Sequence, residues 1–335
     1  MNNHVIIIAE AGVNHNGDYE LAKQLVLNAK EAGVDYVKFQ TAKPELVISR
    51  FAEMAEYQKT NTGMVESQLE MCKKIHLKLE DYKPLKTFCE EVGVKFISTP
   101  FDLLSIDVLE SLDMDFWKVP SGEVTNYPYL VKIANTHRPV VMSTGMCEVE
   151  EVRDAVNVLL DNGLTRDQVS LLHCNTEYPT PFEDVNLKAM NDLVREFGLK
   201  VGYSDHTIGI EVPIAAVAMG AEIIEKHFTL DHNMPGPDHK ASLEPGELKA
   251  MVNAIRNIEK AMGDGKKHVS NSERKNIAVA RKSIIAARDI KKGEVLTEEN
   301  LTVKRPGNGI NPMRWNEVVG KNAIHDFVED ELIEL

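Results

Sequence analysis

Two histidines, each at the end of a short apolar run, are the first residues in this chain whose spacing suggests chemistry. His206 closes the run VGYSDH and His227 closes the run AEIIEKHF, and a stretch of small apolar residues separates them. This order predicts strand, helix, strand, so the two strands should be parallel neighbours. Two imidazoles at the same end of strands about 5 Å apart could share one divalent cation. The alternative is that each histidine caps a strand and bonds to loop backbone.

Two lysines stand inside otherwise apolar strand-like runs. Lys38 lies in YVKFQ and Lys118 lies in FWKVP. A buried ammonium group is costly without a counter-charge. Each lysine therefore either pairs with a carboxylate of the protein or faces an anionic ligand that carries phosphate and carboxylate groups.

The order of apolar runs indicates which elements position these side chains. Eight short apolar runs alternate with helical patterns, from HVIIIAE at residues 4–10 to AEIIEKHF, and a helix over 245–262 follows. Strands that are apolar throughout are buried on both faces, as in a parallel sheet. Eight such units over about 250 residues predict a TIM (β/α)8 barrel. A doubly wound open sheet is the alternative, which the lack of GxGxxG after the first run weakens.

In a TIM barrel the functional side chains lie at the carboxyl ends of the strands. Most residues at the predicted strand ends are polar or charged. They are Glu10, Lys38, Gln40, Ser98, Thr99, Lys118, Ser121, Glu123, Ser143, Thr144, His173, Asn175, Ser204, Asp205, His206, Lys226 and His227. We expect His173 to be bonded within the barrel rather than to act as a ligand.

Composition excludes several classes of protein. The chain has 335 residues, 43% of them hydrophobic, which suffices for one large and one small domain. A formal net charge of −14 argues against nucleic-acid or membrane-surface partners. The apolar run near the N-terminus is too short for a signal peptide or membrane span. The four cysteines form no CxxC motif, so we expect reduced thiols in a cytoplasmic protein.

The composition changes after residue 262. Residues 263–281 are polar, contain a Gly-Asp-Gly break and carry a helical pattern from residue 271, which predicts a linker. Residues 282–335 contain short strand-like runs and glycine turns, typical of a small β-rich domain. We therefore predict a barrel over residues 1–262, a linker over 263–281 and a small domain over 282–335. Because it is small, we expect this domain to dock on another surface.

Several motifs along the whole chain carry a resemblance to a known family. They are AEAGVNHNGD, VKFQT, STPFD, KVPSGE, STGM, HCNTEYPTPFEDVNL, YSDHT, EKHFTLD, GPDHKAS and KRPGNG. With these the chain resembles the sialic acid synthase family. The resemblance implies a TIM barrel followed by an antifreeze-like (SAF) domain, and a domain-swapped homodimer. It also implies condensation of phosphoenolpyruvate with an N-acylated mannosamine-type sugar, giving a nonulosonic acid and phosphate. A divalent metal is implied too, typically Mn²⁺, with Mg²⁺ or Co²⁺ as substitutes.

Within this family the first expectation is an N-acetylneuraminate synthase that uses open-chain N-acetylmannosamine. The alternative is an N,N'-diacetyllegionaminate synthase that uses 2,4-diacetamido-2,4,6-trideoxymannose. Two further alternatives come from other classes of protein. One is an aldolase that forms a Schiff base through Lys118, and the other is a sugar-binding protein without catalysis.

The reaction suggests roles for the candidate residues. A metal on His206 and His227 would polarise the aldehyde oxygen, while Lys38 and Lys118 would hold phosphate and carboxylate. We expect Glu123 to handle protons or grip a sugar hydroxyl. Glu10 would touch the metal or its water, or form a salt bridge with a lysine. Short donors expected at the remaining substrate oxygens are Thr99, Ser121, Asn175 and Ser204.

The resemblance adds residues at the sugar and one from the small domain. It places Gln40, Tyr178 and Asp238 at the sugar, and either Asn175 or Thr176 in contact with substrate. Arg305 lies in LTVKRPGNG, a loop shaped by proline and glycine, and its guanidinium offers a fork of donors. We expect Arg305 to complete the active site of the partner subunit.

Overall fold

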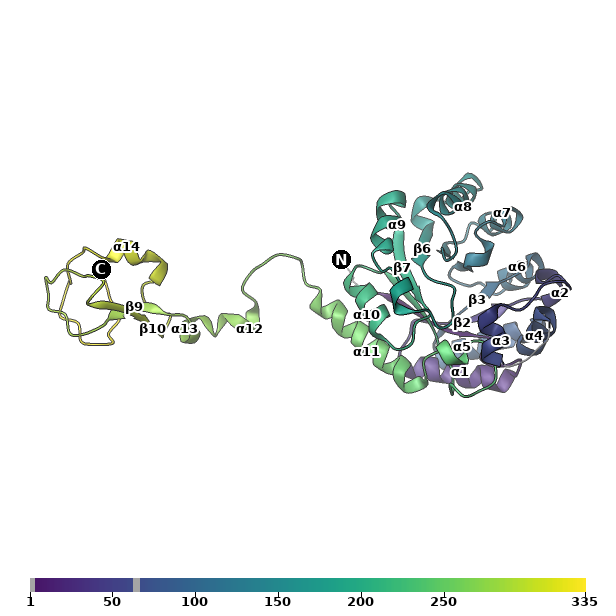
Figure 1. The fold of residues 1–335 in the computed structure, drawn as a ribbon, viewed down its shortest axis with the longest axis horizontal. Helices are drawn as coiled ribbons and strands as arrows, with labels where there is room; N and C mark the ends of the chain where they lie inside the picture. Colours follow the sequence, from purple (N-terminus) through teal and green to yellow (C-terminus); the bar gives the residue numbers. More distant parts are fainter. Residues whose placement is uncertain (1–3, 63–66) are drawn as a thin grey trace. The chain divides into compact units, whose positions relative to one another are not determined.

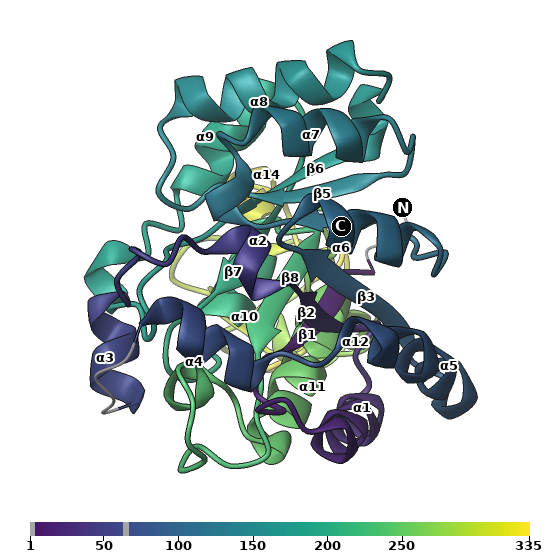
Figure 2. The same cartoon turned by 90° about the vertical axis from the view of Figure 1, so that its right-hand side faces the viewer.

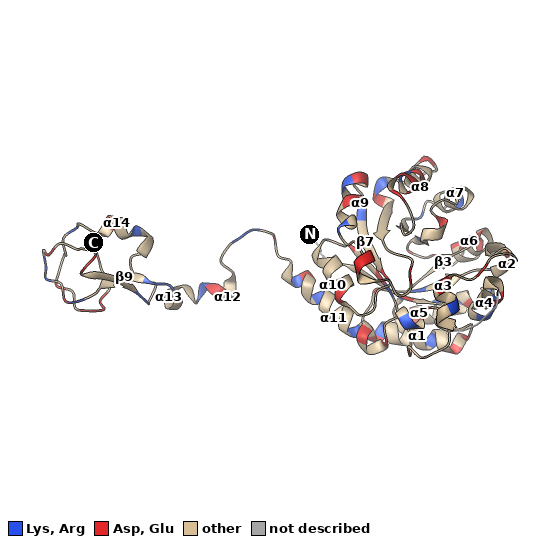
Figure 3. Ribbon diagram, in the orientation of Figure 1, with Lys and Arg blue, Asp and Glu red and all other residues tan. Residues whose placement is uncertain are grey.

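The computed structural model describes residues 4–62 and 67–335. The chain divides into two compact units at Met262 and Gly263, and each has its own hydrophobic core (Figure 1). The first unit carries the cavity described below. Figure 3 shows acidic and basic residues interspersed along the helices. No described helix combines the length and the apolar character needed to cross a membrane.

Eight parallel strands form the centre of the first unit. They are β1 (Ile6–Gly12), β2 (Tyr36–Thr41), β3 (Lys95–Pro100), β4 (Trp117–Val119), β5 (Val140–Ser143), β6 (Val169–His173), β7 (Lys200–Asp205) and β8 (Ile223–His227). Hydrogen bonds join them in the order β3-β2-β1-β8-β7-β6-β5-β4. The two end strands, β3 and β4, lie next to each other and nearly close the ring (Figure 2). The predicted TIM barrel is confirmed, and the open doubly wound sheet is excluded.

Helices follow the strands as the βα pattern predicts. They are α1 (Tyr19–Ala32), α2 (Pro44–Val47), α3 (Glu56–Thr62), α4 (Gln68–Ile75), α5 (Tyr82–Val92), α6 (Leu103–Glu110), α7 (Tyr127–Ala134), α8 (Val149–Asp161), α9 (Ala189–Phe197), α10 (Glu211–Ala218) and α11 (Pro245–Ala261). Helix α1 shows why their ends fall where they do. The Asp18 side chain accepts from the first free N–H groups, and Gly33 ends the helix at φ 84°.

The connection from β2 to β3 is the one large excursion in the described part of the barrel. It contains α2, α3 and α4, which lie over the carboxyl ends of the strands (Figure 2). The sequence predicts a helix over residues 66–75. In the structure α4 begins at Gln68, with Ser67 as its N-cap, and residue 66 lies outside the described residues. These helices form one side of the cavity.

The second unit is small and has little regular structure. It contains α12 (Asn271–Arg274), α13 (Ile277–Ala280), β9 (Ser283–Ala286), β10 (Leu301–Lys304) and α14 (Trp315–Val318). β9 and β10 pair antiparallel, and isolated bridges join further segments to this sheet region. Its core includes Ile284, Leu296 and Phe327, all almost fully buried.

Candidate active site

A cavity of about 630 Å³ opens at the carboxyl ends of the barrel strands. Its floor comes from strand ends, and one side comes from α2, α3 and α4. Most of the residues predicted from the sequence to form a site line this cavity. They are Glu10, Lys38, Gln40, Thr99, Lys118, Ser121, Thr176, Tyr178, Ser204, His206, His227 and Asp238.

The two strand lysines meet at one carboxylate on the cavity floor. Lys38 Nζ lies 3.4 Å from one oxygen of Glu225, and Lys118 Nζ lies 3.4 Å from the other. Ser204 donates to the same carboxylate at 2.9 Å. Lys38 also forms an ion pair with Glu10. The structure therefore shows both lysines paired with protein carboxylates inside a cavity that could admit an anionic ligand.

Hydroxyl groups complete the surroundings of the lysines. Lys38 Nζ donates to Thr99 Oγ1 at 3.0 Å, and Lys118 Nζ donates to Ser143 Oγ at 2.7 Å. All these side chains are almost fully buried. Burial lowers the pKa of Lys38 to about 7, and the Glu225 carboxylate opposes this shift. Burial would raise the pKa of Glu225, but the two ammonium groups lower it to about 2, so this carboxylate stays ionised.

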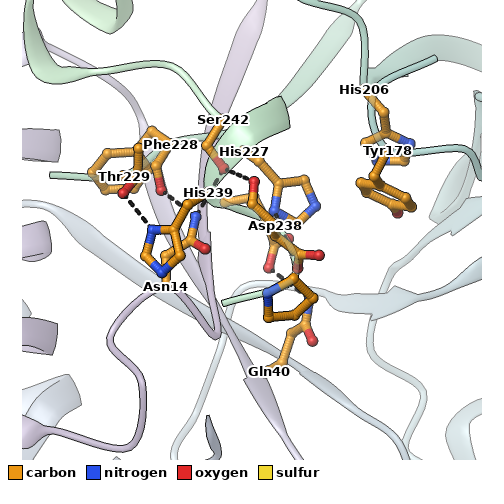
Figure 4. A network of polar contacts seen from close by, with 12 residues as sticks. Asn14, Gln40, Tyr178, His206, His227, Phe228, Thr229, Asp238, His239 and Ser242 are labelled. Carbon is orange, nitrogen blue, oxygen red and sulfur yellow. Dashed lines mark hydrogen bonds and ion pairs between the residues drawn. The ribbon is translucent and has the colours of Figure 1, made fainter. Parts of the chain in front are cut away.

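The two predicted metal histidines do face each other. Their ring centroids lie 5.4 Å apart, and the Tyr178 ring packs against both, with its centroid 4.1 Å from that of His206 (Figure 4). The His206 Nδ1 bonds to the backbone carbonyl of Asn175. Burial lowers the pKa of His206 to about 4 and that of His227 well below its ordinary value. Both imidazoles are therefore neutral at pH 7.

Neutral imidazoles with free lone pairs suit a divalent cation. The bond to a carbonyl fixes the proton of His206 on Nδ1 and leaves Nε2 as an acceptor. The Nδ1 of His227 is buried and has no hydrogen-bond partner in the described part of the chain; it lies 4.0 Å from Asp238 Oδ2. Within residues 4–62 and 67–335, no three His, Cys, Asp or Glu side chains are arranged to hold a metal. A bound ion would therefore need water or substrate oxygens beside the two histidines.

A hydrogen-bonded loop holds Asp238 over the cavity. Asn14 Nδ2 donates to the Phe228 carbonyl and to Ser242 Oγ, both at 2.8 Å, and Ser242 Oγ donates to the Asp238 carbonyl at 2.7 Å (Figure 4). Burial raises the pKa of Asp238 to about 6. This carboxyl can therefore exchange a proton near neutral pH.

A fully buried ion pair ties together the two strands that carry the histidines. Lys226 on β8 pairs with Asp205 on β7, and both side chains have zero exposure. The Lys226 ammonium also donates to the Thr207 carbonyl. Thr207 in turn donates to the Asp205 carboxylate through its backbone N–H at 3.1 Å. This network fixes the two strand ends from the side opposite to Glu225 and His227.

Three predicted residues lie elsewhere. Glu123 is half-buried in a 3₁₀ turn and accepts from Asn126, and it is not among the described residues that line the cavity. Burial raises its pKa. Asn175 turns its Oδ1 to the backbone N–H of Glu177, at 2.7 Å, whereas Thr176 lines the cavity. Arg305 lies in the second unit and donates to the Ala280 carbonyl.

Two smaller predictions concern other side chains. His173 bonds to the backbone carbonyl of Val185 at 2.9 Å, as expected of a barrel histidine that is not a ligand. The four cysteines are free thiols. The residue that sequence reasoning missed is Glu225, although it lies two positions before His227 on the same strand.

The fold and the cavity define a TIM-barrel enzyme. The NeuB family model matches residues 25–267 and the SAF domain model matches residues 281–334, so the chain belongs to the NeuB family and ends in an SAF domain. The expected resemblance, the fold and the synthase class are confirmed by these matches and by the relatives below.

Three relatives are informative. The chain is 55% identical to an N,N'-diacetyllegionaminic acid synthase of Campylobacter jejuni, covering 98% of each chain. It is 50% identical to an N,N'-diacetyllegionaminic acid synthase of Legionella pneumophila, over 94% of this chain and 89% of the relative. A crystal structure of an N-acetylneuraminic acid synthetase from Leptospira borgpetersenii, in complex with citrate, is 34% identical with a TM-score of 0.72. That match covers 82% of this chain and 91% of the other.

Proposed function

We propose that this protein is an N,N'-diacetyllegionaminate synthase, which condenses phosphoenolpyruvate with 2,4-diacetamido-2,4,6-trideoxymannose. The observation that carries the proposal is the 55% and 50% identity to two diacetyllegionaminic acid synthases over nearly the whole chain. The match to the N-acetylneuraminic acid synthetase is weaker, at 34%. The comparisons therefore favour the alternative substrate over the first expectation, N-acetylmannosamine.

The charged floor of the cavity supports binding of phosphoenolpyruvate. Lys38 and Lys118 supply two ammonium groups, and Thr99 and Ser143 supply hydroxyls beside them. Each ammonium group lies 3.4 Å from a different carboxylate oxygen of Glu225, which stands between them. A ligand with a phosphate at one end and a carboxylate at the other can engage both lysines together. Burial of the site strengthens such contacts because water is excluded.

The residues present also fit a divalent cation. His206 and His227 would hold it, because both are neutral and the Nδ1 of His227 is buried without a hydrogen-bond partner among the described residues. When bound, an ion such as Mn²⁺ would polarise the aldehyde oxygen of the sugar. We expect His227→Ala to weaken Mn²⁺ binding measured by calorimetry, and chelation to abolish turnover. Full activity in a chelated enzyme would remove the metal from the proposal.

The proposed condensation forms one carbon–carbon bond and breaks one carbon–oxygen bond. C3 of phosphoenolpyruvate forms a bond to the aldehyde carbon, whose oxygen takes a proton and becomes a hydroxyl. Water adds its oxygen to C2, and one of its protons balances the proton taken up by the aldehyde oxygen. Cleavage of the bond between C2 and the phosphate oxygen then gives the C2 keto group, and the second proton leaves with the released phosphate. Asp238, with a pKa of about 6, can supply or accept a proton at the sugar end of the cavity. Tyr178 and Gln40 line the same cavity and are suited to sugar hydroxyls.

Phosphate release tests the proposed substrate. With phosphoenolpyruvate and metal present, kcat/KM should be higher for 2,4-diacetamido-2,4,6-trideoxymannose than for N-acetylmannosamine. A higher kcat/KM for N-acetylmannosamine would instead favour an N-acetylneuraminate synthase. Borohydride with pyruvate should trap no covalent adduct, whereas an adduct on Lys118 would indicate an aldolase.

The SAF domain is proposed to act across a homodimer, with Arg305 reaching the partner's cavity. At limiting phosphoenolpyruvate, homodimers of Arg305→Ala subunits and homodimers of Lys118→Met subunits should each have low activity. Mixed dimers should recover part of the activity, because one of their two cavities would have every residue intact. Verified mixed dimers without recovery would show that Arg305 acts in its own chain or has no role.

A further inference from the structure

Two loops bring Tyr178 and Asp238 to the cavity from different strands. Tyr178 lies in the loop after β6, residues 174–188, and Asp238 lies in the loop after β8, residues 228–244. Both side chains face His227: the Tyr178 ring centroid lies 5.5 Å from that of His227, and Asp238 Oδ2 lies 4.0 Å from His227 Nδ1 (Figure 4). In the proposed function both side chains contact the sugar, so their relative position decides how the sugar is held.

Each of these loops has its own anchor on the barrel. In the loop after β6, the Thr180 N–H donates to the His206 carbonyl at 2.9 Å, and His206 Nδ1 bonds to the Asn175 carbonyl. In the loop after β8, Ser242 Oγ donates to the Asp238 carbonyl at 2.7 Å. These bonds hold each loop separately and do not join one loop to the other.

Helix α3 supplies a side chain that joins the two loops. Asn61 Nδ2 donates to the Tyr178 carbonyl at 3.3 Å and to the Pro237 carbonyl at 2.7 Å. Carbonyl oxygens only accept, so both hydrogens of the Asn61 amide are used in this bridge. The Pro237 carbonyl belongs to the same planar peptide group as the N–H of Asp238. The bridge therefore fixes the backbone that carries Asp238 as well as the backbone of Tyr178.

Helix α3 also contacts the first of these loops through an aromatic ring. The Tyr57 ring lies 5.2 Å from the Tyr178 ring, between centroids, and Tyr57 lines the cavity. None of the residues of α3 is buried, so the helix gains little from an apolar face packed on the barrel. Its contacts with the two loops therefore carry much of its placement.

We propose that Asn61 is a positioning residue for the sugar, which sets the separation of Tyr178 and Asp238 by holding both backbones at once. The inference rests on the proposed function and adds to the sugar site a residue that acts from behind the cavity surface. Asn61 is not among the described residues that line the cavity, so it acts through its two partners. Without it each loop keeps its own anchor but can shift relative to the other. A displacement of about 1 Å can cost on the order of 100-fold in rate.

Asn61→Asp is the sharpest test, because the side chain keeps its size but a carboxylate offers only acceptors to the two carbonyls. We expect kcat/KM for 2,4-diacetamido-2,4,6-trideoxymannose to fall about tenfold or more, measured by phosphate release at saturating phosphoenolpyruvate. The KM for phosphoenolpyruvate should stay the same, because Lys38 and Lys118 lie on the cavity floor. Asn61→Ala should show the same difference between the two substrates.

Lys59 provides a matched control on the same helix. It is exposed, its Nζ lies 3.7 Å from Glu53 and 3.8 Å from Glu56, and it is not among the described residues that line the cavity. Lys59→Ala should leave both kinetic constants unchanged. Thermal unfolding should stay near that of the wild type in all three variants, because α3 contributes no buried residue.

Double-mutant cycles show whether Asn61 acts through the two loops. In a Tyr178→Phe or an Asp238→Asn background, Asn61→Ala should cost less kcat/KM for the sugar than it does in the wild type, because the contact that it positions is already weakened. In a Lys118→Met background the cost should be the same as in the wild type.

The outcomes separate this inference from the proposed function. If the wild type releases no phosphate with 2,4-diacetamido-2,4,6-trideoxymannose or with N-acetylmannosamine, the proposed function fails and the inference fails with it. If the wild type is active and Asn61→Asp keeps its kcat/KM for the sugar, or is impaired equally toward both substrates, the function stands and Asn61 has no positioning role. An equal loss in Lys59→Ala, or losses that add fully to those of Tyr178→Phe and Asp238→Asn, would also overturn the inference.

Discussion

The buried ion pair between Lys226 and Asp205 gives a quantitative prediction. Both side chains have zero exposure, so Lys226→Met would leave a carboxylate inside the protein without its counter-charge. Breaking a buried pair by removing one partner costs about 3–5 kcal/mol. Thr207 still donates two hydrogen bonds to Asp205, at 2.9 and 3.1 Å. We therefore expect a loss near the low end, about 3 kcal/mol of unfolding free energy.

The same pair should affect the candidate metal site. Asp205 precedes His206 and Lys226 precedes His227, so loosening the pair would let the two imidazoles move apart. We expect Lys226→Met to weaken Mn²⁺ binding as well as stability. Calorimetry measures the change in Mn²⁺ binding, and chemical denaturation measures the change in stability. Both can be done on folded protein, because a loss of about 3 kcal/mol leaves most domains folded at 25 °C.

A double variant distinguishes the loss of the ion pair between Lys226 and Asp205 from the loss of side-chain packing. In Asp205→Asn/Lys226→Met neither charge remains, and the Asn still accepts from Thr207, so most of the stability should return. Two results would refute the reasoning. One is a loss below about 1 kcal/mol in Lys226→Met, and the other is a double variant as unstable as the sum of both single variants.

Three further predictions concern other residues. Burial, and to a smaller extent His76, lower the pKa of His15 to about 3, below its ordinary value of about 6.5. The neutral side chain therefore stabilises the fold above pH 6.5, and this contribution is lost as the pH falls. Lowering the pH from 7 to 5 should reduce the unfolding free energy, measured by denaturation, by about 2 kcal/mol, and His15→Gln should abolish this pH-dependent loss. Lys118→Met should raise the KM for phosphoenolpyruvate about tenfold or more and leave that for the sugar unchanged, whereas a change confined to the sugar would contradict the assignment. Asn14→Ala should lower the unfolding free energy by about 2 kcal/mol and raise the KM for the sugar, because it frees the loop that carries Asp238.

The barrel could be predicted because its signal is repeated and local. Each strand is a short apolar run between helical patterns, and a run such as IIIAEAG has few other ways to bury its side chains. Strand ends are then functional positions by the geometry of the fold. This reasoning brought Lys38, Lys118, His206 and His227 to one cavity, where the structure places them.

The sequence prediction missed Glu225 because it did not use the alternating direction of side chains along β8. Side chains along a strand point alternately to the two sides, so Glu225 and His227 share the inner side and Lys226 lies on the other. The list of strand-end residues contained Lys226, which pairs with Asp205 away from the cavity. Applying the period of two to EIIEKHF would have found the carboxylate that joins both lysines.

Other features depend on contacts that a sequence does not specify. Asn175 has a donor and an acceptor suited to substrate, yet its side chain bonds to the backbone of its own loop, a common alternative for Asn. One side of the cavity comes from α2, α3 and α4, in a long connection where no periodic pattern showed how it folds back over the barrel.

The stoichiometry of the reaction tests the central proposal most directly. Purified enzyme would be given phosphoenolpyruvate, Mn²⁺ and 2,4-diacetamido-2,4,6-trideoxymannose, and phosphate release, sugar consumption and product mass would be measured together. We predict one phosphate released for each sugar consumed, and a product with the mass of N,N'-diacetyllegionaminic acid. Phosphate release without a product of that mass, or no release with this sugar, would contradict the proposed function.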